Sequence, residues 1–166
     1  MNKAVMISIH PKWCKLIANG KKTIEIRKTR PKLETPFKCY IYETLGKLGK
    51  EVSWRVWEYE GKGKVIGEFV CDYIYELHEY ELTPQGEFYL HEKARLDLFL
   101  EQSCLSYGEI CDYRKNLPCH KPLYAWEISN LVIYDQPKEL SEFINLKGEP
   151  ITRAFQSWGY VSGKDN

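Results

Sequence analysis

The sequence predicts an α+β fold with a curled or barrel-like sheet. About five segments have strand character and two or three short segments have helix character, and most strands follow one another through loops instead of alternating with helices. The chain of 166 residues is 43% hydrophobic and 14% aromatic, which is enough apolar material for one folded core. We therefore expect a globular protein with a single domain.

The chain begins with a predicted strand, helix and strand. Residues 3–9, KAVMISI, are a short and nearly continuous apolar run, which is typical of a buried strand. Pro11 suits the first position of a helix and Gly20 suits a left-handed C-cap, so the helically spaced apolar residues between them predict a helix over 11–19. In residues 23–28, TIEIRK, apolar and polar side chains alternate, which predicts a strand with an apolar back and a charged front.

The middle and the end of the chain predict more strands and two helices. These are the strands 37–44, 64–77 and 122–135 and the helices 91–102 and 106–114. Gly67 is expected to form a bulge in its strand. The stretch SYGE places Glu109 three residues after Ser106, which is a capping box at the start of the second of these helices.

Two segments carry weaker signals of regular structure. Residues 44–63 are rich in glycine and include Trp54 and Trp57, so we expect a surface excursion or a long hairpin. The tail that follows the last long strand has few regular signals and ends in aromatic residues, which we expect to anchor it.

Charge is distributed unevenly along the chain. The 24 basic and 23 acidic residues nearly balance, but residues 21–32 hold six basic side chains and one acid, Glu25, which leaves 18 basic and 22 acidic residues elsewhere. Residues 72–101 hold eight acids against Lys93 and Arg95. A polyanion is therefore expected to approach the first segment and to avoid the second.

Several classes of site are not indicated by the sequence. There is no P-loop or GxGxxG motif, and the six cysteines and four histidines show no metal-ligand spacing. We expect no metal or other cofactor, and reduced cysteines that are mostly buried. No apolar run is long enough to span a membrane and the first residues do not resemble a secretory signal, so we expect a soluble, cytoplasmic protein with no membrane partner.

The charged face of strand 23–28 is the strongest candidate for a site. Arg27 offers a bidentate fork for a phosphate or a base edge, and Glu25 can accept hydrogen bonds from an exocyclic amine. With Lys22, the amides at the start of helix 11–19 and nearby tryptophans, these groups would complete an anion or nucleobase pocket. A solvent-facing edge strand with weakly paired Glu25 and Arg27 has the same pattern, so spacing alone leaves both interpretations open.

The segment GKKTIEIR, from Gly20 to Arg27, resembles the signature of the ASCH domain family, which belongs to the PUA-like superfamily. The resemblance covers residues 4–143, which we take as the domain. It implies a PUA-like β-barrel of about five to six strands with short helices at its mouth. Residues 144–166 are expected to pack on this domain as a C-terminal tail.

The tail segment ITRAFQSWGYV also resembles the ending of small bacterial and phage members of the family. Ala154 and Phe155 stand where prolines are expected in that ending.

The resemblance also implies a function, which is binding of RNA or a modified nucleoside or nucleotide. The expected site is a basic cleft between the barrel and the first helix. Its residues are Lys22, Thr23, Glu25 and Arg27, with Lys12 and Trp13 of the helix beside them.

Two other functions stay open. One branch of the family hydrolyses N4-acetylcytidine with a lysine, a threonine nucleophile and a glutamate, and Lys22 matches the lysine whereas Glu25 occupies the threonine position. A hydrolase acting on an N4-acylated cytidine or on RNA is therefore the alternative, with Lys22 and Glu25 as acid and base and Glu101 as a third catalytic residue. A protein interaction module that uses residues 44–63 and the aromatic tail ranks third, and its partner is not indicated.

Overall fold

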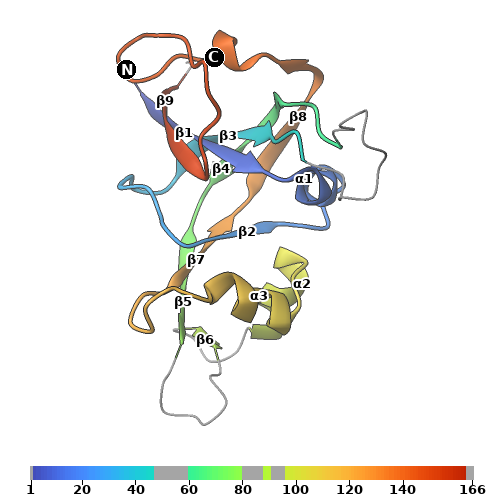
Figure 1. Ribbon diagram of the computed structural model, residues 1–166, viewed down its shortest axis with the longest axis vertical. Coiled ribbons are helices and arrows are strands. Elements are labelled where there is room, and N and C mark those ends of the chain that lie inside the picture. Colours follow the sequence, from blue (N-terminus) through green and yellow to red (C-terminus); the bar gives the residue numbers. More distant parts are fainter. Residues whose placement is uncertain (1, 47–59, 80–87, 91–95, 164–166) are drawn as a thin grey trace, which may run out of the picture.

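The strands in the described part of the chain form two sheets (Figure 1). The computed structural model describes residues 2–46, 60–79, 88–90 and 96–163. The strands are β1 (Lys3–Ile9), β2 (Ile24–Arg27), β3 (Phe37–Glu43), β4 (Lys64–Cys71), β5 (Ile74–Glu79), β6 (Phe88–Leu90), β7 (Leu123–Glu127), β8 (Ser129–Lys138) and β9 (Trp158–Ser162). The helices are α1 (Pro11–Ala18), α2 (Leu96–Ser103) and α3 (Tyr107–Arg114), with a 3-10 turn at Leu140–Glu142.

The α+β class predicted from the sequence is confirmed, but the strands that are described do not close into one barrel. The larger sheet has the order β8-β4-β3-β1-β9, in which β1 and β3 are parallel, and the smaller sheet has the order β2-β7-β5-β6. Helices α2 and α3 lie beside the smaller sheet (Figure 1). Phe99 of α2 and Ile110 of α3 pack there against Ile24 and Ile26 of β2.

Each of the two longest predicted strands is divided between the sheets. Residues 64–77 become β4 in the larger sheet and β5 in the smaller one, and residues 122–135 become β7 and β8. The backbone amide of Glu127 donates to the carbonyl of Tyr73 at 3.0 Å, at the point where both segments pass from one sheet to the other. No glycine or proline marks either turn, so each segment has the sequence pattern of one continuous strand.

Gly67 lies where the chain needs a residue without a side chain. The β4–β8 pairing shifts its register between Val65 and Gly67, as expected for a bulge. A Cβ atom on Gly67 would lie 2.4 Å from the backbone oxygen of Val132 on β8. The missing side chain therefore allows β8 to approach β4 closely.

Strand β1 is buried on both faces, which explains its continuous apolar sequence. Val5 and Ile7 point to a core that also contains Trp126 of β7. Met6 points to the opposite side, where it packs with Phe143.

The C-terminal tail contributes a strand to the larger sheet. Strand β9 runs antiparallel to β1, with Val161 opposite Ala4. The indole Nε1 of Trp158 donates to Thr29 Oγ1 at 3.0 Å, and the hydroxyl of Tyr160 accepts from the backbone amide of Lys32 at 2.7 Å. The aromatic end of the tail is thus joined to the loop that follows β2.

Most of the glycine-rich excursion expected at residues 44–63, including Trp54 and Trp57, lies outside the described residues. Among the residues that are described, no helix is both long enough and apolar enough to cross a membrane.

A hydrogen-bonded cluster on the larger sheet gives a prediction about pH. The hydroxyl of Tyr134 donates to Glu68 Oε2 at 2.5 Å, and Lys38 Nζ lies 3.1 Å from Glu68 Oε1. Burial alone would raise the pKa of the Glu68 carboxyl, but the hydrogen bonds from Tyr134 and Lys38 outweigh it and the pKa is lowered. The ionised carboxylate therefore stabilises the fold above the ordinary glutamate pKa of 4.5, and this contribution is lost as the pH falls through the folded-state pKa.

Urea unfolding of the wild type and of Glu68→Gln should show this pH dependence directly. We expect the wild type to be the more stable protein near neutral pH and the two free energies of unfolding to converge below pH 4.5. Glu34→Gln, which changes an exposed glutamate, is the control and should follow the wild type. A difference between wild type and Glu68→Gln that stays constant with pH would contradict the assignment.

Candidate functional site

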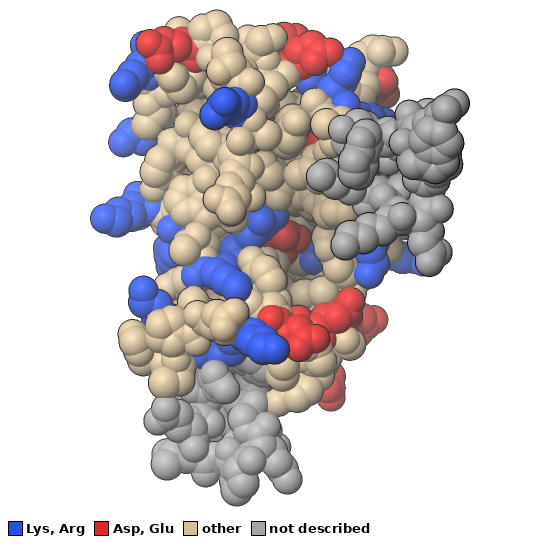
Figure 2. Space-filling model, in the orientation of Figure 1, with Lys and Arg blue, Asp and Glu red and all other residues tan. Residues whose placement is uncertain are grey.

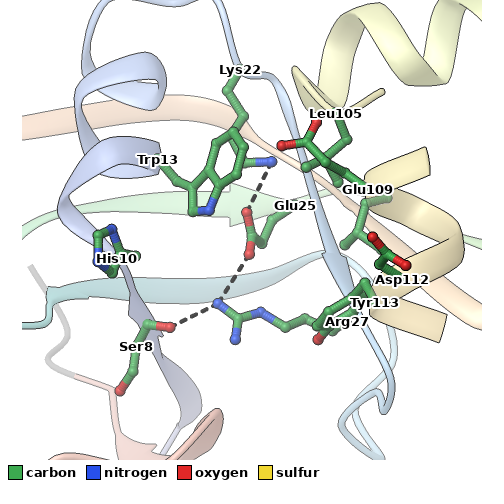
Figure 3. A pocket seen from close by; sticks show the side chains of 11 residues that line it. Ser8, His10, Trp13, Lys22, Glu25, Arg27, Leu105, Glu109, Asp112 and Tyr113 are labelled. Carbon is green, nitrogen blue, oxygen red and sulfur yellow. Dashed lines mark hydrogen bonds and ion pairs between the residues drawn. The ribbon is translucent and has the colours of Figure 1, made fainter. Parts of the chain in front are cut away.

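A pocket of about 430 Å³ opens between α1, β2 and α3 (Figure 3). Its volume is within the range of small-molecule sites. The lining residues are Ser8, His10, Trp13, Lys22, Glu25, Ile26, Arg27, Leu105, Glu109, Asp112 and Tyr113.

Lys22 reaches the floor of the pocket from the turn after α1. Gly20 takes a φ of 74°, and the backbone amides of Lys21 and Lys22 both donate to the carbonyl of Leu16, which fixes this turn. The Lys22 side chain is only 2% exposed, and its Nζ donates to the backbone oxygen of Ser103 at 2.7 Å. The same Nζ lies 3.2 Å from Glu25 Oε2.

Glu25 lies between two cations (Figure 3). Its Oε1 is 3.0 Å from Nη2 of Arg27, and the guanidinium also donates to the carbonyl of Ser8 at 2.8 Å and to Ser157 Oγ at 3.3 Å. Glu25 and Arg27 are two positions apart on β2, so the alternation of the strand places them on one face. We call Lys22, Glu25 and Arg27 the ion triad.

Two buried polar atoms of the ion triad have no hydrogen-bond partner among the described residues. They are Oε2 of Glu25 and Nε of Arg27. The Lys22 ammonium is close enough to Oε2 for an ion pair, but it does not approach in a hydrogen-bonding direction. Buried polar groups are almost always satisfied, so an acceptor and a donor at this pocket favour a ligand with complementary polar atoms.

Aromatic and apolar side chains form the walls of the pocket. Trp13 of α1 stands above the floor, with Nζ of Lys22 5.1 Å from its ring centroid. Tyr113 of α3 lies across from it, with Nζ of Lys28 5.0 Å from its ring centroid. Burial raises the pKa of the Tyr113 hydroxyl, and Arg27 partly opposes this shift. Both rings line the pocket, and aromatic side chains are the groups on which proteins stack a flat ring.

The start of α3 adds carboxylates to the lip of the pocket. Ser106 and Glu109 form the capping box predicted from SYGE, and hydrogen bonds from the backbone and the hydroxyl of Ser106 hold the pKa of Glu109 below its usual value. Asp112 follows on the same helix. Together with Glu25, these residues give the lining three carboxylates against the two cations Lys22 and Arg27, so the interior is not the basic cleft expected from the sequence.

The amides at the start of α1 are already used within the chain, which corrects the expectation that they would bind a ligand. Pro11 has no amide hydrogen, the amide of Lys12 donates to Nδ1 of His10 at 3.4 Å, and that of Trp13 donates to the carbonyl of His10 at 2.9 Å.

The other residues expected in the site lie outside this pocket. Thr23 lines a separate pocket of about 370 Å³, together with residues of α2, β5 and β7. Lys12 is exposed on α1, with Nζ 3.9 Å from Glu109 Oε1 and 4.3 Å from the ring centroid of Trp13. Glu101 is exposed on α2 and is not among the residues that line the pocket.

Several residues that line the pocket or hold its side chains in place were not indicated by the sequence. Ser8 and Ser157 contact Arg27 from opposite ends of the chain, and Tyr113 comes from a third segment. No local pattern marks them. The capping box was the one available signal for α3, and it located the helix without showing that Glu109 and Asp112 line a pocket.

Cys14 is not a candidate nucleophile. Its Sγ is buried and donates to the backbone oxygen of Ile9 at 3.6 Å. Burial, with Glu43 and Glu25 nearby, raises the pKa of this thiol far above its usual value, so the reactive thiolate is disfavoured.

The protein is thus of the class with an α+β fold and a partly polar pocket between the first helix and a neighbouring strand. The family model of the ASCH domain matches residues 7–141, so the chain belongs to the ASCH domain family. No curated protein matches.

Solved structures of one ASCH protein resemble the fold. The ASCH protein from Zymomonas mobilis is 20% identical, with a TM-score of 0.57, over 96% of this chain and 87% of that one. A tyrosine-to-phenylalanine mutant of the same protein is 18% identical, with a TM-score of 0.55, over 96% of this chain and 90% of that one. A serine-to-alanine mutant gives the same identity and TM-score over 96% and 88%.

Proposed function

We propose that this ASCH protein binds a base of RNA, or a modified nucleoside, in the pocket between α1, β2 and α3. The observation that carries the proposal is a largely buried ion triad in which Oε2 of Glu25 and Nε of Arg27 make no hydrogen bond, beside two aromatic side chains. Proteins recognise unpaired bases by stacking them on aromatic rings and by hydrogen bonds to their polar edges.

The charge of the pocket favours a base over a phosphate. Both cations of the ion triad already contact Glu25 and backbone oxygens, so much of their charge is already compensated within the chain. A base carries neutral donors and acceptors, which Oε2 of Glu25 and Nε of Arg27 would complement.

Replacing Trp13 tests the proposal with limited effect on the ion triad. Trp13→Leu keeps an apolar side chain against the core but removes the aromatic face. We expect binding of a short fluorescein-labelled single-stranded RNA of mixed sequence to weaken roughly tenfold or more, because stacking is worth about 1–3 kcal/mol per base. Fluorescence anisotropy measures the affinity, and N4-acetylcytidine serves as an unlabelled competitor.

The matched control is Tyr73→Ala, which removes an exposed aromatic side chain away from the pocket. It should bind the RNA like the wild type, and Trp13→Phe should retain most of the affinity. Unchanged binding by a folded Trp13→Leu protein would show that the pocket is not the binding site.

A hydrolase acting on an N4-acylated cytidine or on RNA is the second candidate. The observation in its favour is the distance of 3.2 Å between Lys22 Nζ and Glu25 Oε2, which brings an acid and a base together at the pocket floor. Mass spectrometry of both substrates after incubation tests it. A product that forms with the wild type and disappears with folded Glu25→Gln would support it, and intact substrates would exclude it.

A further inference from the structure

Five of the six basic residues of segment 21–32 form two groups in the structure, and the sixth, Lys21, is exposed in the turn after α1. Lys22 and Arg27 belong to the ion triad and are largely buried. Lys28 is half-buried and Arg30 and Lys32 are exposed, and none of these three forms an ion pair with another described residue. The second group therefore holds positive charge that remains available to a ligand on the side of the pocket where β2 ends.

These three cations follow one another along the loop after β2, beginning at the mouth of the pocket. The Lys28 ammonium lies over Tyr113, which lines the pocket. Figure 2 shows a hollow in the middle of this face, with Lys and Arg side chains gathered on its left side, where Figure 1 places this loop, and Asp and Glu side chains on the side of α2 and α3. We call Lys28, Arg30 and Lys32 the basic track.

The backbone of this loop is held in place by the tail. Thr29 Oγ1 accepts from the indole of Trp158, and the amide of Lys32 donates to the hydroxyl of Tyr160. The track therefore presents its charges from an anchored backbone, at a lower entropic cost than a free loop. Glu34 is the acid of this loop, and it lies beyond Lys32 along the chain.

We propose that the pocket takes one base of a single-stranded RNA and that the phosphates next to this base run along the basic track. This inference rests on the proposed function and assigns its ligand to a polynucleotide instead of a free nucleoside. Phosphates would leave the pocket toward Lys28, because Glu109 and Asp112 repel them on the α3 side. A single strand is required, since a base can enter the pocket only when it is unpaired and unstacked.

The test compares two double variants in anisotropy titrations with the labelled single-stranded RNA over a series of salt concentrations. Arg30→Ala/Lys32→Ala removes two charges of the track, and Lys3→Ala/Lys147→Ala removes two exposed charges elsewhere. We expect the track variant to bind roughly tenfold more weakly at low salt. For this variant, the slope of log affinity against log salt concentration should become shallower by about 0.7 for each phosphate contact removed. The control should keep both values.

Further comparisons distinguish a wrong assignment of the basic track from a wrong assignment of the pocket. Wild-type affinity and salt slope in the track variant, with binding still lost in Trp13→Leu, would overturn the track and leave the pocket proposal standing. If the wild type binds no RNA, both proposals fail. Equal binding of a duplex of the same sequence would overturn the single-strand assignment, and a free nucleoside that binds as tightly as the RNA would overturn the role of the phosphates.

Discussion

Replacing Glu25 by glutamine is expected to lower the free energy of unfolding by about 3–5 kcal/mol, because it leaves two buried cations without an anionic partner. The Glu25 residue is 6% exposed, and its carboxylate contacts both Lys22 and Arg27. Glutamine has nearly the same shape, so the loss would come from charge and not from packing. Urea denaturation near neutral pH measures it.

Lys22→Met tests whether the loss of stability comes from unpaired charge or would follow from any substitution in the pocket. The ion triad carries two positive charges and one negative charge, so removing Lys22 leaves a balanced pair of Glu25 and Arg27. We expect Lys22→Met to be less destabilising than Glu25→Gln, although the carbonyl of Ser103 loses a donor. Asp112→Asn, an exposed carboxylate of the same pocket, should stay within about 0.5 kcal/mol of the wild type. The opposite order of the two triad variants would contradict the charge argument.

A protein that ends at Glu149 is expected to lose its cooperative fold. The truncation removes β9, which pairs with β1 over five positions, and it removes the buried side chains of Ile151 and Val161. Each buried aliphatic side chain stabilises by about 1.5–3 kcal/mol and each backbone hydrogen bond by about 1 kcal/mol, which together approach the whole stability of a typical domain.

Thermal unfolding followed by near-UV and far-UV circular dichroism tests the truncation. A control that ends at Gly163 keeps β9 and should unfold like the full chain. A cooperative transition in the shorter protein would instead show that residues 4–143 fold alone and that the tail only packs on them, as the sequence suggested.

The parts of the fold that the sequence predicted correctly depend on neighbouring residues. The continuous apolar run of β1, the proline and glycine around α1 and the capping box of α3 are all local signals, and these elements form where they were expected. The turns that divide the two longest strands were not predicted, because no glycine or proline marks them and apolar residues stand on both sides of each. Strand β9 was not predicted either, since its pairing depends on β1 at the other end of the chain.

The candidate site, too, was predicted correctly only where neighbouring residues determine it. Alternation along TIEIRK was sufficient to place Glu25 and Arg27 on one face, and the structure brings Lys22 to them. The pattern could not show that Arg27 would be held by Ser8 and Ser157, or that Tyr113 would form a wall, because these contacts depend on tertiary packing. It also could not show that carboxylates from α3 would offset the basic charge inside the pocket.

The contacts of the tail with the pocket floor have a consequence for the order in which the site forms. Ser8 Oγ donates to the carbonyl of Phe155, 147 positions later, and Arg27 reaches Ser157, 130 positions later. During synthesis, the early segments emerge long before these partners exist, and contacts of such high sequence separation form slowly. A nascent chain can therefore build α1 early, but β2 has to wait for its partner β7. The pocket is complete only after Ser157 has left the ribosome and β9 has joined the larger sheet.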